Sequence, residues 1–265
     1  MSVQNAPATL QHIELAQDGP VSRVTLNRPD RYNALSHELM IELRETLEQI
    51  VADPGIQVVI LAGAGRGFSA GHDLSEMVGR EDGFYDVLFE ECTALMQTIR
   101  RMPQPVIARV HGVATAAGCQ LVASCDLAVA TRDARFGTPG VRIGLFCSTP
   151  MVPLSRAIGR KRALQMLLTG ELIDAPTALD WGLVNQMVQP DDLGTATDAL
   201  AARIAQASPR TVAIGKEAFY AQVDRDEDGA YELTKSVMAR NASIADAQEG
   251  MSAFIEKREP VWRAD

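Results

Sequence analysis

The sequence predicts an α/β protein with a mostly helical C-terminal region. Short apolar runs, typical of buried strands, alternate with longer segments whose apolar residues recur every three to four positions, as on one face of a helix. From about residue 56 to residue 130 this alternation favours a layered sheet with crossover helices. From residue 149 onward the pattern is mainly helical. We therefore place an α/β core at residues 1–200 and a helical region at residues 201–265, within a single domain.

The N-terminal elements follow from alternation and from turn residues. Two strand-like runs, at residues 12–15 and 21–26, flank Asp18 and Gly19, a pair typical of antiparallel hairpins. Ser36 can cap the helix that follows. The apolar face of this helix carries Leu39, Leu43, Leu47 and Ile50. A continuous apolar strand is then expected at residues 58–61.

The remaining elements are placed by the same patterns. A second amphipathic helix is expected around residues 87–99, and strands at residues 106–110 and 127–130 enclose an apolar helical segment. A short strand is expected at residues 184–188. The later helices are expected at residues 150–158, 161–168, 191–206, 211–222, 230–244 and 248–257. Because they are long and partly apolar, we expect them to pack against another subunit.

Composition excludes several classes of protein. Of the 265 residues, 46% are hydrophobic and 22% charged, as in globular rather than disordered chains. The net charge of -9 opposes nucleic-acid binding, and the absence of a long apolar run opposes a membrane span. The first ten residues lack arginine and an apolar segment, so we expect a cytoplasmic location. The four cysteines form no C-x-x-C pair, which indicates packed thiols and no metal site.

A strand-to-helix turn is the first candidate site. It lies within HGVATAAGCQLVASC at residues 111–125, where small residues precede an apolar helical segment. Small side chains let a ligand approach the backbone, and the first turn of a helix has N–H groups without internal partners. The turn is therefore a place to hold developing negative charge.

A glycine-rich loop at residues 63–73 is the second candidate site. Its glycines are spaced G-x-G-x-G and not G-x-G-x-x-G, and no helix begins directly after the third glycine. The spacing therefore opposes dinucleotide binding.

Two stretches together identify a family resemblance. FSAGHDLSEM at residues 68–77 and HGVATAAGCQLVASCDLAVA at residues 111–130 resemble the crotonase family, also called enoyl-CoA hydratase/isomerase. The stretches AGHDL, TAAGCQLVASCD and TPGVRIGLFCSTP are most similar to its enoyl-CoA hydratase domain-containing protein 3 subgroup. The resemblance covers essentially the whole chain. It implies a ClpP/crotonase-like spiral of β-β-α units with a helical C-terminal trimerisation region, assembled as a trimer or a dimer of trimers.

The resemblance also implies a site for a coenzyme A thioester, as substrate or ligand, without a covalently bound cofactor. Backbone N–H groups of His72 and Ala117 would hold the thioester oxygen, and such donors are each worth roughly 10²–10³ in rate. The residues implied to contact coenzyme A are Arg31, Tyr32, Ala34, Ala70, Asp73, Leu74, Phe254 and Lys257. The last two would reach the ligand of a neighbouring subunit.

The sequence departs from the family at the two glutamates that hydrate an enoyl double bond. Gln120 and Gly140 stand at those positions. A neutral amide can orient water but cannot take its proton, and glycine supplies no side chain. Ser148 is a possible polar group of the pocket, and neither it nor Cys147 has a recognisable base beside it. The imidazole of His72 could contribute besides its amide.

Three functions remain open from the sequence. The first is an enzyme of acyl-CoA metabolism, nominally an enoyl-CoA hydratase or isomerase, with weak or altered hydratase activity. The second is a regulatory protein that binds acyl-CoA without turnover. The third is a thioester hydrolase or decarboxylase that uses other residues of the pocket. The acyl group itself cannot be read from the sequence.

Overall fold

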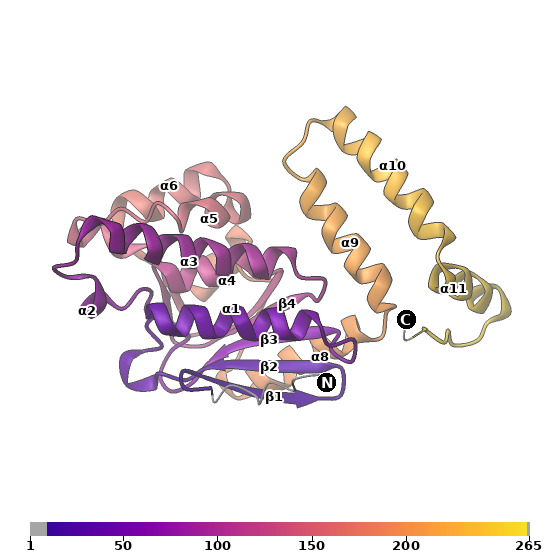
Figure 1. Cartoon of the computed structure of the whole chain (residues 1–265), viewed down its shortest axis with the longest axis horizontal. Helices are drawn as coiled ribbons and strands as arrows, with labels where there is room; N and C mark the ends of the chain where they lie inside the picture. Colours follow the sequence, from indigo (N-terminus) through magenta and orange to yellow (C-terminus); the bar gives the residue numbers. More distant parts are fainter. Residues whose placement is uncertain (1–9, 264–265) are drawn as a thin grey trace, which may run out of the picture.

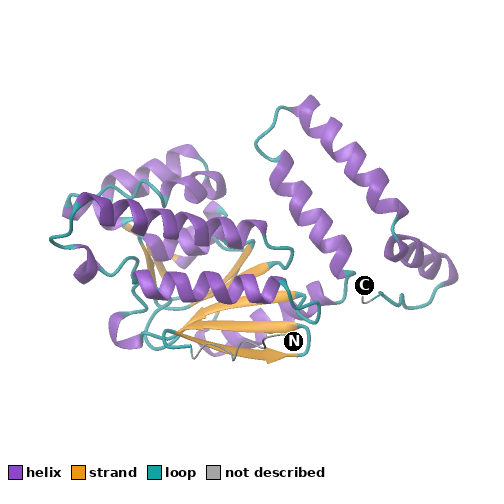
Figure 2. Cartoon of the chain, in the orientation of Figure 1, coloured by secondary structure: helices purple, strands orange, loops and turns teal. Residues whose placement is uncertain are grey.

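The computed structural model describes residues 10–263, and a six-stranded sheet forms its centre (Figure 2). The strands are β1 (Ile13–Asp18), β2 (Val21–Leu26), β3 (Val58–Gly63), β4 (Val106–Val110), β6 (Leu127–Thr131) and β9 (Gln186–Val188), in that spatial order. Only β1 and β2 pair antiparallel, so the predicted hairpin is confirmed, and the other neighbours are parallel. The predicted layered sheet with crossover helices is therefore confirmed.

Helices cover both faces of this sheet (Figure 1). On β3, Val59 and Leu61 pack into the cluster formed with α1 (His37–Val51) and α3 (Asp82–Arg101). The alternate residues Val58 and Ile60 face α8 (Leu193–Ala205) on the other side. Successive side chains of a strand point to opposite faces, so a strand covered on both sides is apolar throughout.

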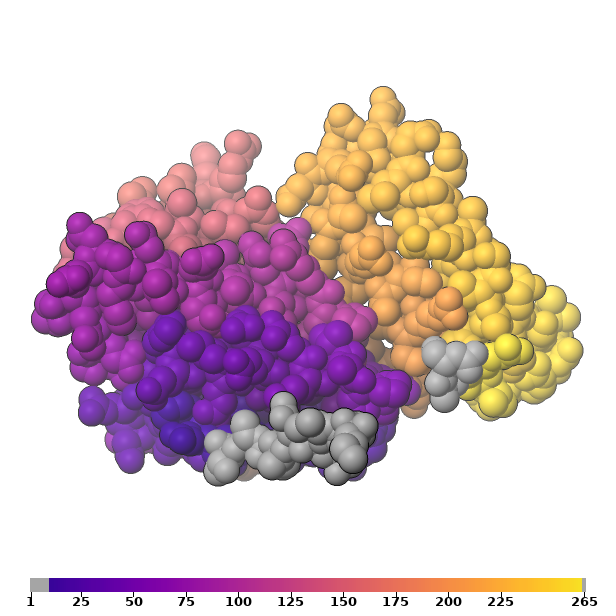
Figure 3. Space-filling model, viewed as in Figure 1, coloured from indigo at the N-terminus to yellow at the C-terminus, as the bar shows by residue number. Residues whose placement is uncertain are grey.

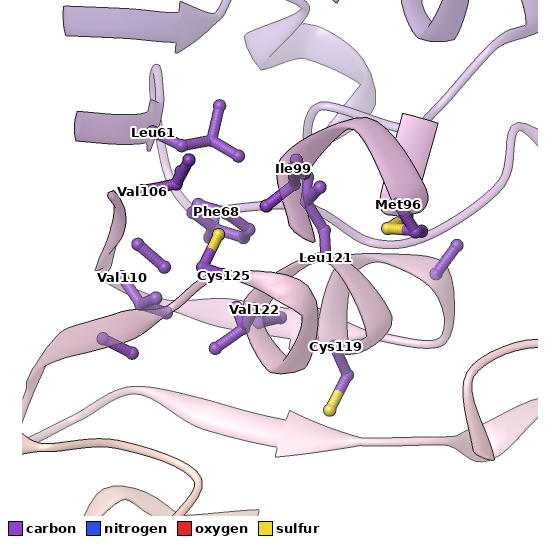
Figure 4. Packing of buried hydrophobic residues seen from close by; sticks show 14 of the residues in the cluster. Leu61, Phe68, Met96, Ile99, Val106, Val110, Cys119, Leu121, Val122 and Cys125 are labelled. Carbon is purple, nitrogen blue, oxygen red and sulfur yellow. The ribbon is translucent and has the colours of Figure 1, made fainter. Parts of the chain in front are cut away.

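A second, smaller sheet carries the strand-to-helix turn. It contains β5 (Val113–Thr115), β7 (Arg135–Gly137) and β8 (Leu172–Asp174). The sequence analysis missed all three strands, because three residues are too few to show an alternating pattern. The apolar helix α4 (Ala117–Ser124) follows β5, and its Leu121 and Val122 are buried in the core beside Phe68 (Figure 4). This packing fixes the first turn of α4.

Short helices complete the core. They are η1 (Pro29–Arg31), α2 (Leu74–Met77), η2 (Pro139–Ile143), α5 (Met151–Ile158), α6 (Arg160–Thr169), α7 (Ala175–Trp181) and η3 (Pro190–Asp192). Asp174 caps α7 by accepting a hydrogen bond from the Thr177 N–H at 2.9 Å. The sequence analysis did not expect α7.

The C-terminal helices form a separate lobe beside the core (Figures 1 and 3). They are α9 (Pro209–Gln222), α10 (Glu227–Ser243) and α11 (Ala245–Glu256), close to three of the predicted ranges. Neither α9 nor α10 has a buried apolar residue. The boundary predicted after residue 200 falls inside α8, which packs on the sheet through Ala201. In the described chain, the helices that lie apart from the core therefore begin at Pro209.

A buried ion pair attaches this lobe to the core, in addition to the exposed pair of Arg156 with Asp224. The Lys216 ammonium of α9 lies 2.7 Å from an Asp126 carboxylate oxygen and donates to the carbonyl oxygens of Ile99 and Gln104, both at 2.9 Å. The Tyr220 hydroxyl donates to the other Asp126 oxygen at 2.8 Å. The Lys216 side chain is only 7% exposed, so the charge is stabilised by these partners rather than by water.

Candidate functional site

The turn before α4 holds an unusual backbone conformation. Ala116, the residue before the helix, has φ 50° and ψ -119°, a region that L-residues rarely adopt. Its N–H donates to the Gly137 carbonyl at 2.8 Å, which ties the turn to β7. Such a conformation costs about 1–3 kcal/mol and persists where the surrounding structure enforces it. The turn directs the Ala117 N–H away from the helix interior.

The loop after β3 packs directly against this turn. Ser69 hydrogen-bonds across to β5, since its N–H donates to the Val113 carbonyl at 3.1 Å and its carbonyl accepts from the Thr115 N–H at 2.9 Å. Gly71 has φ +96°, and a Cβ there would lie 2.8 Å from the Ala116 Cβ and 3.1 Å from the Ala117 nitrogen. Only glycine therefore allows this approach, and it brings the His72 backbone beside Ala117.

The His72 and Ala117 N–H groups are both free of protein acceptors in the described part of the chain. Their neighbours are not, because the Gly71 N–H donates to Ser69 Oγ at 3.3 Å and the Asp73 N–H to the Leu35 carbonyl at 3.1 Å. Both residues line the same cavity. Two adjacent, unpartnered N–H donors can hold an oxygen that becomes negatively charged.

The cavity in front of these donors has a volume of about 420 Å³. Seven of the residues singled out from the sequence line it: Ala70, His72, Leu74, Ala117, Gly140, Cys147 and Ser148. Arg142 is the one permanently charged side chain among the described lining residues, and none of them is Asp or Glu. The cavity therefore offers hydrogen-bond donors and apolar surface but no carboxylate.

The His72 imidazole is neutral at physiological pH. Burial lowers its pKa to about 4, and its ring packs edge-on to Phe89 with 5.4 Å between centroids. Neither ring nitrogen reaches a partner with full hydrogen-bond geometry among the described residues, and the nearby Leu35 backbone only partly opposes the effect of burial on the pKa. The ring therefore adds no positive charge beside the two donors.

Gln120 and Gly140, the residues predicted to stand in place of the family's glutamates, differ from each other in their surroundings. Gln120 is 3% exposed, and its Oε1 accepts from Thr149 Oγ1 at 3.3 Å and lies 3.8 Å from Cys92 Sγ. It lines a second cavity rather than the first. At Gly140 a Cβ would lie 2.8 Å from Cys147 Sγ and would also collide with the Leu145 carbonyl. The loop after η2 is thus packed against a glycine that has no room for a side chain.

Ser148 and Cys147 lie at the cavity without an activating partner. The Ser148 hydroxyl donates to the Phe146 carbonyl at 3.4 Å. Burial raises the pKa of the Cys147 thiol, although a hydrogen bond with the Gly140 backbone opposes it. A raised pKa lowers the fraction of thiolate, so the surroundings of Cys147 do not favour a nucleophile.

The residues predicted to contact coenzyme A are spread over two parts of the molecule. The Ala70 N–H donates to the Tyr32 carbonyl at 2.9 Å, which joins the cavity to η1, where Arg31 and Ala34 flank Tyr32. Phe254, 86% exposed, and Lys257 lie instead at the end of α11 in the C-terminal lobe (Figure 1).

Asp73 has a structural role at the edge of the cavity. Its carboxylate caps α2 by accepting from the Ser75 N–H at 3.2 Å, and it also accepts from Arg28 Nη2 at 2.9 Å. Burial would raise the pKa of Asp73, but the hydrogen bonds from Ser75 and Arg28 outweigh it and lower the pKa. Arg28 is therefore not free to bind a phosphate. His111 contacts the Gly65 carbonyl through Nε2 at 2.9 Å.

Sequence reasoning missed the apolar lining of the cavity. Phe89 from α3, Ile143 at the end of η2, and the loop residues Leu145 and Phe146 all contribute to it. The apolar residues after Gly144 could have indicated this lining, because exposed Leu and Phe side chains in a loop that contains glycine are unusual at a free surface.

Other kinds of site are not formed within residues 10–263. No cluster of three His, Cys, Asp or Glu side chains there has the arrangement of a metal site. None of the helices in that range combines the length and apolar character needed to cross a bilayer. All four cysteines are buried free thiols, as the sequence predicts.

Known proteins match almost the whole chain. The family model for enoyl-CoA hydratase/isomerase matches residues 16–265. Enoyl-CoA hydratase domain-containing protein 3, mitochondrial, of Xenopus laevis is 45% identical over 97% of this chain and 89% of its own length. The human protein of that name is 44% identical over 91% of this chain and 80% of its own length. These names do not support the predicted cytoplasmic location, and residues 1–9, which carried that prediction, lie outside the described residues.

Solved structures show the same fold. An enoyl-CoA hydratase of Mycobacterium smegmatis is 47% identical, with a TM-score of 0.93 over 96% of this chain and 99% of the other. Human enoyl-CoA hydratase domain-containing protein 3 is 42% identical, with a TM-score of 0.93 over 95% of this chain and 100% of the other. The predicted crotonase fold and the predicted subgroup are therefore confirmed. The chain belongs to the enoyl-CoA hydratase/isomerase family and is similar to its enoyl-CoA hydratase domain-containing protein 3 group.

Proposed function

We propose that the protein binds an acyl-CoA thioester and polarises its carbonyl between the N–H groups of His72 and Ala117. The observation that carries this proposal is the pair of unpartnered donors at one end of a 420 Å³ cavity. Its chemistry differs from two-glutamate hydration, because Gln120 and Gly140 supply no acid or base. No further cofactor is needed for this step.

The lack of carboxylates favours one reaction class in particular. A 2-carboxyacyl-CoA can lose CO2 without a protein base, because the broken C–C bond leaves its electron pair as an enolate. The two N–H groups would hold the enolate oxygen, and water would then supply the proton to Cα. Arg142, the cation of the lining, is the group that would attract the substrate carboxylate. The alternative is binding without turnover.

The experiment compares acetyl-CoA with S-ethyl-CoA, a thioether that lacks the carbonyl oxygen. We expect calorimetry to show acetyl-CoA binding about tenfold more tightly, since two hydrogen bonds of about 0.5–1.5 kcal/mol each are involved. Ala117→Pro removes one donor and should reduce the difference; melting temperatures check that this variant folds, because a proline disfavours the backbone conformation of the preceding Ala116. Equal affinities for the two ligands in the folded wild-type protein would refute the proposal.

Turnover is tested with a panel of enoyl-, 3-hydroxyacyl- and 2-carboxyacyl-CoA thioesters. We expect slow or no loss of the conjugated enoyl absorbance and measurable CO2 release from the carboxyacyl compounds. Binding of the panel without any turnover would instead establish the regulatory alternative.

We also propose a homo-oligomer formed through the C-terminal helices. Large apolar side chains are exposed along α9, α10 and α11, among them Phe219, Tyr231, Met238, Met251, Phe254 and Ile255. Such a surface is typical of a subunit interface. Light scattering should give the mass of a trimer or a hexamer, and a monomer at micromolar concentration would contradict this.

A further inference from the structure

The Cys147 thiol occupies the space beside Gly140 that a side chain at residue 140 would otherwise fill. A Cβ added to Gly140 would lie 2.8 Å from Cys147 Sγ. Cys147 is 7% exposed and lines the cavity that also contains the His72 and Ala117 donors. A proton-carrying group therefore lies at the part of the cavity wall where Gly140 itself supplies no side chain.

Backbone hydrogen bonds hold Cys147 in this place. At one end of the loop the Leu145 N–H donates to the Gly140 carbonyl at 3.0 Å. At the other end the N–H of Met151, the first residue of α5, donates to the Cys147 carbonyl at 3.1 Å. The loop between η2 and α5 is thus attached to both helices, and the position of the sulfur is set by the fold.

Cys147 carries the most acidic uncharged group among the described residues of the lining. The hydroxyl groups of Ser148 and Thr149 are weaker acids, and they already donate to the Phe146 carbonyl at 3.4 Å and to Gln120 Oε1 at 3.3 Å. A thiol has an ordinary pKa of about 8.5, against about 15.7 for water, so it releases a proton far more readily than water does. Burial raises the pKa of the Cys147 thiol, so the group keeps its proton at neutral pH.

The property that makes Cys147 a poor nucleophile suits it to be an acid. A nucleophile needs the thiolate, whereas a proton donor needs the protonated thiol. Loss of CO2 from a 2-carboxyacyl-CoA leaves an enolate whose Cα must gain a proton. The Gly140 backbone opposes burial and lowers the pKa of Cys147, which means that it stabilises the sulfur anion left after such a transfer.

We propose that Cys147 donates the proton to Cα of the enolate that decarboxylation produces. This inference rests on the proposed decarboxylation at the His72 and Ala117 donors. The C–C bond to the carboxylate breaks, CO2 leaves, and the electron pair of the bond enters the enolate. That pair then forms a C–H bond with the thiol proton, the carbonyl reforms, and the sulfur anion takes a proton from water. Water is thus the source of the proton, and Cys147 is its last carrier.

The first test determines the face on which Cα is protonated. One epimer of 2-carboxypropanoyl-CoA is decarboxylated in D2O, and NMR of a chiral ester of the product gives the configuration of the 2-deuteriopropanoyl group. A fixed donor delivers the deuteron to one face, so we expect one enantiomer from the wild-type protein and a racemic product from Cys147→Ala. CO2 release by Cys147→Ala should fall less than about tenfold, below the 10²–10⁴ typical of acid–base groups, because C–C cleavage precedes the transfer.

Cys119→Ala is the matched control for this test. Cys119 is another buried thiol, packed in the core by α4 (Figure 4), and it is not among the described residues that line the cavity. This variant should still give one enantiomer. A racemic product from the wild-type protein, or a single enantiomer from folded Cys147→Ala, would overturn the role of the thiol. A wild-type protein that binds the thioester but releases no CO2 would instead refute the proposed decarboxylation.

The second test measures whether the thiol lies against Cα, and it does not depend on turnover. Bromoacetyl-CoA carries bromide on Cα, so attack by the Cys147 sulfur forms an S–C bond, releases bromide and passes the thiol proton to water. We expect mass spectrometry to find the label on Cys147 and not on Cys119, and excess acetyl-CoA to suppress it. Binding of bromoacetyl-CoA without alkylation of Cys147 would show that the thiol lies away from Cα and would overturn the inference.

Discussion

The buried imidazole of His72 predicts a specific loss of stability in mild acid. Its pKa falls from an ordinary value of 6.5 to about 4 because burial disfavours the charged ring. Between these two values the unfolded chain binds a proton that the folded chain does not. The free energy of unfolding therefore rises with pH through this window, and His72 destabilises the fold as the pH falls from 6.5 towards 4.

The magnitude follows from the width of the window. Each pH unit is worth about 1.4 kcal/mol, so the full window from 6.5 to 4 amounts to about 3 kcal/mol. Typical domains have an unfolding free energy of about 5–15 kcal/mol, so this one group accounts for a measurable share of it. His72→Phe removes the titration and keeps an aromatic ring against Phe89, which isolates the effect of the charge.

The assay is urea unfolding of both proteins at pH 7.5, 6.5, 5.5 and 4.5. We expect the wild-type protein to lose about 2–3 kcal/mol more than His72→Phe between the two extremes, with nearly the whole difference arising below pH 6.5. Parallel pH profiles for the two proteins would show that the imidazole has a partner in solution, and the account of a neutral, unpaired ring would be wrong.

Two further substitutions test the packing around the site and the attachment of the lobe. Gly140→Ala should lower the unfolding free energy by about 1–3 kcal/mol, because the added Cβ meets Cys147 Sγ and the Leu145 carbonyl. The control is Gly83→Ala, which should not lower it, because the space around Gly83 is open. Equal stabilities of the two variants in urea titrations would contradict this. Lys216→Met should lower the unfolding free energy by about 3–5 kcal/mol, because it leaves Asp126 without its buried counter-ion. Lys235→Met, at an exposed ion pair, is the control. Similar losses of stability in the two variants would refute the anchoring role of Lys216.

The sequence predicted the elements that repeat a simple pattern. The strand at residues 58–61 was found because both faces of β3 are covered, which makes every position apolar. The helix after Ser36 was found because the Ser36 hydroxyl accepts from the Leu39 N–H at 3.2 Å and the buried residues keep helical spacing. Local rules sufficed here, since each residue's role depends on neighbours within a few positions.

The small sheet and the direction in which the Gln120 side chain points could not be predicted from such local patterns. Strands of three residues, such as β5 and β7, are set by contacts across about 20 residues of chain, not by their own composition. The family motif predicted that Gln120 lies about one turn into α4. The cavity that its amide faces depends on the position of Thr149, which lies on a later loop. Family motifs thus predicted two residues, His72 and Ala117, that line one cavity, but not the surroundings of Gln120 and Gly140.

The surroundings of Gln120 and Gly140 also limit whether glutamates could be introduced at these positions by mutation. Gly140 is held by the loop that ends at Cys147, so a glutamate there must first displace the Leu145 carbonyl. Gln120, in contrast, has the same shape as glutamate and already faces an open cavity. A carboxylate at residue 120 alone would gain a base without its acid partner and would lie in a buried site, where its pKa would rise. The loop packing at Gly140 therefore opposes a glutamate there, in addition to the absence of carboxyl groups at residues 120 and 140.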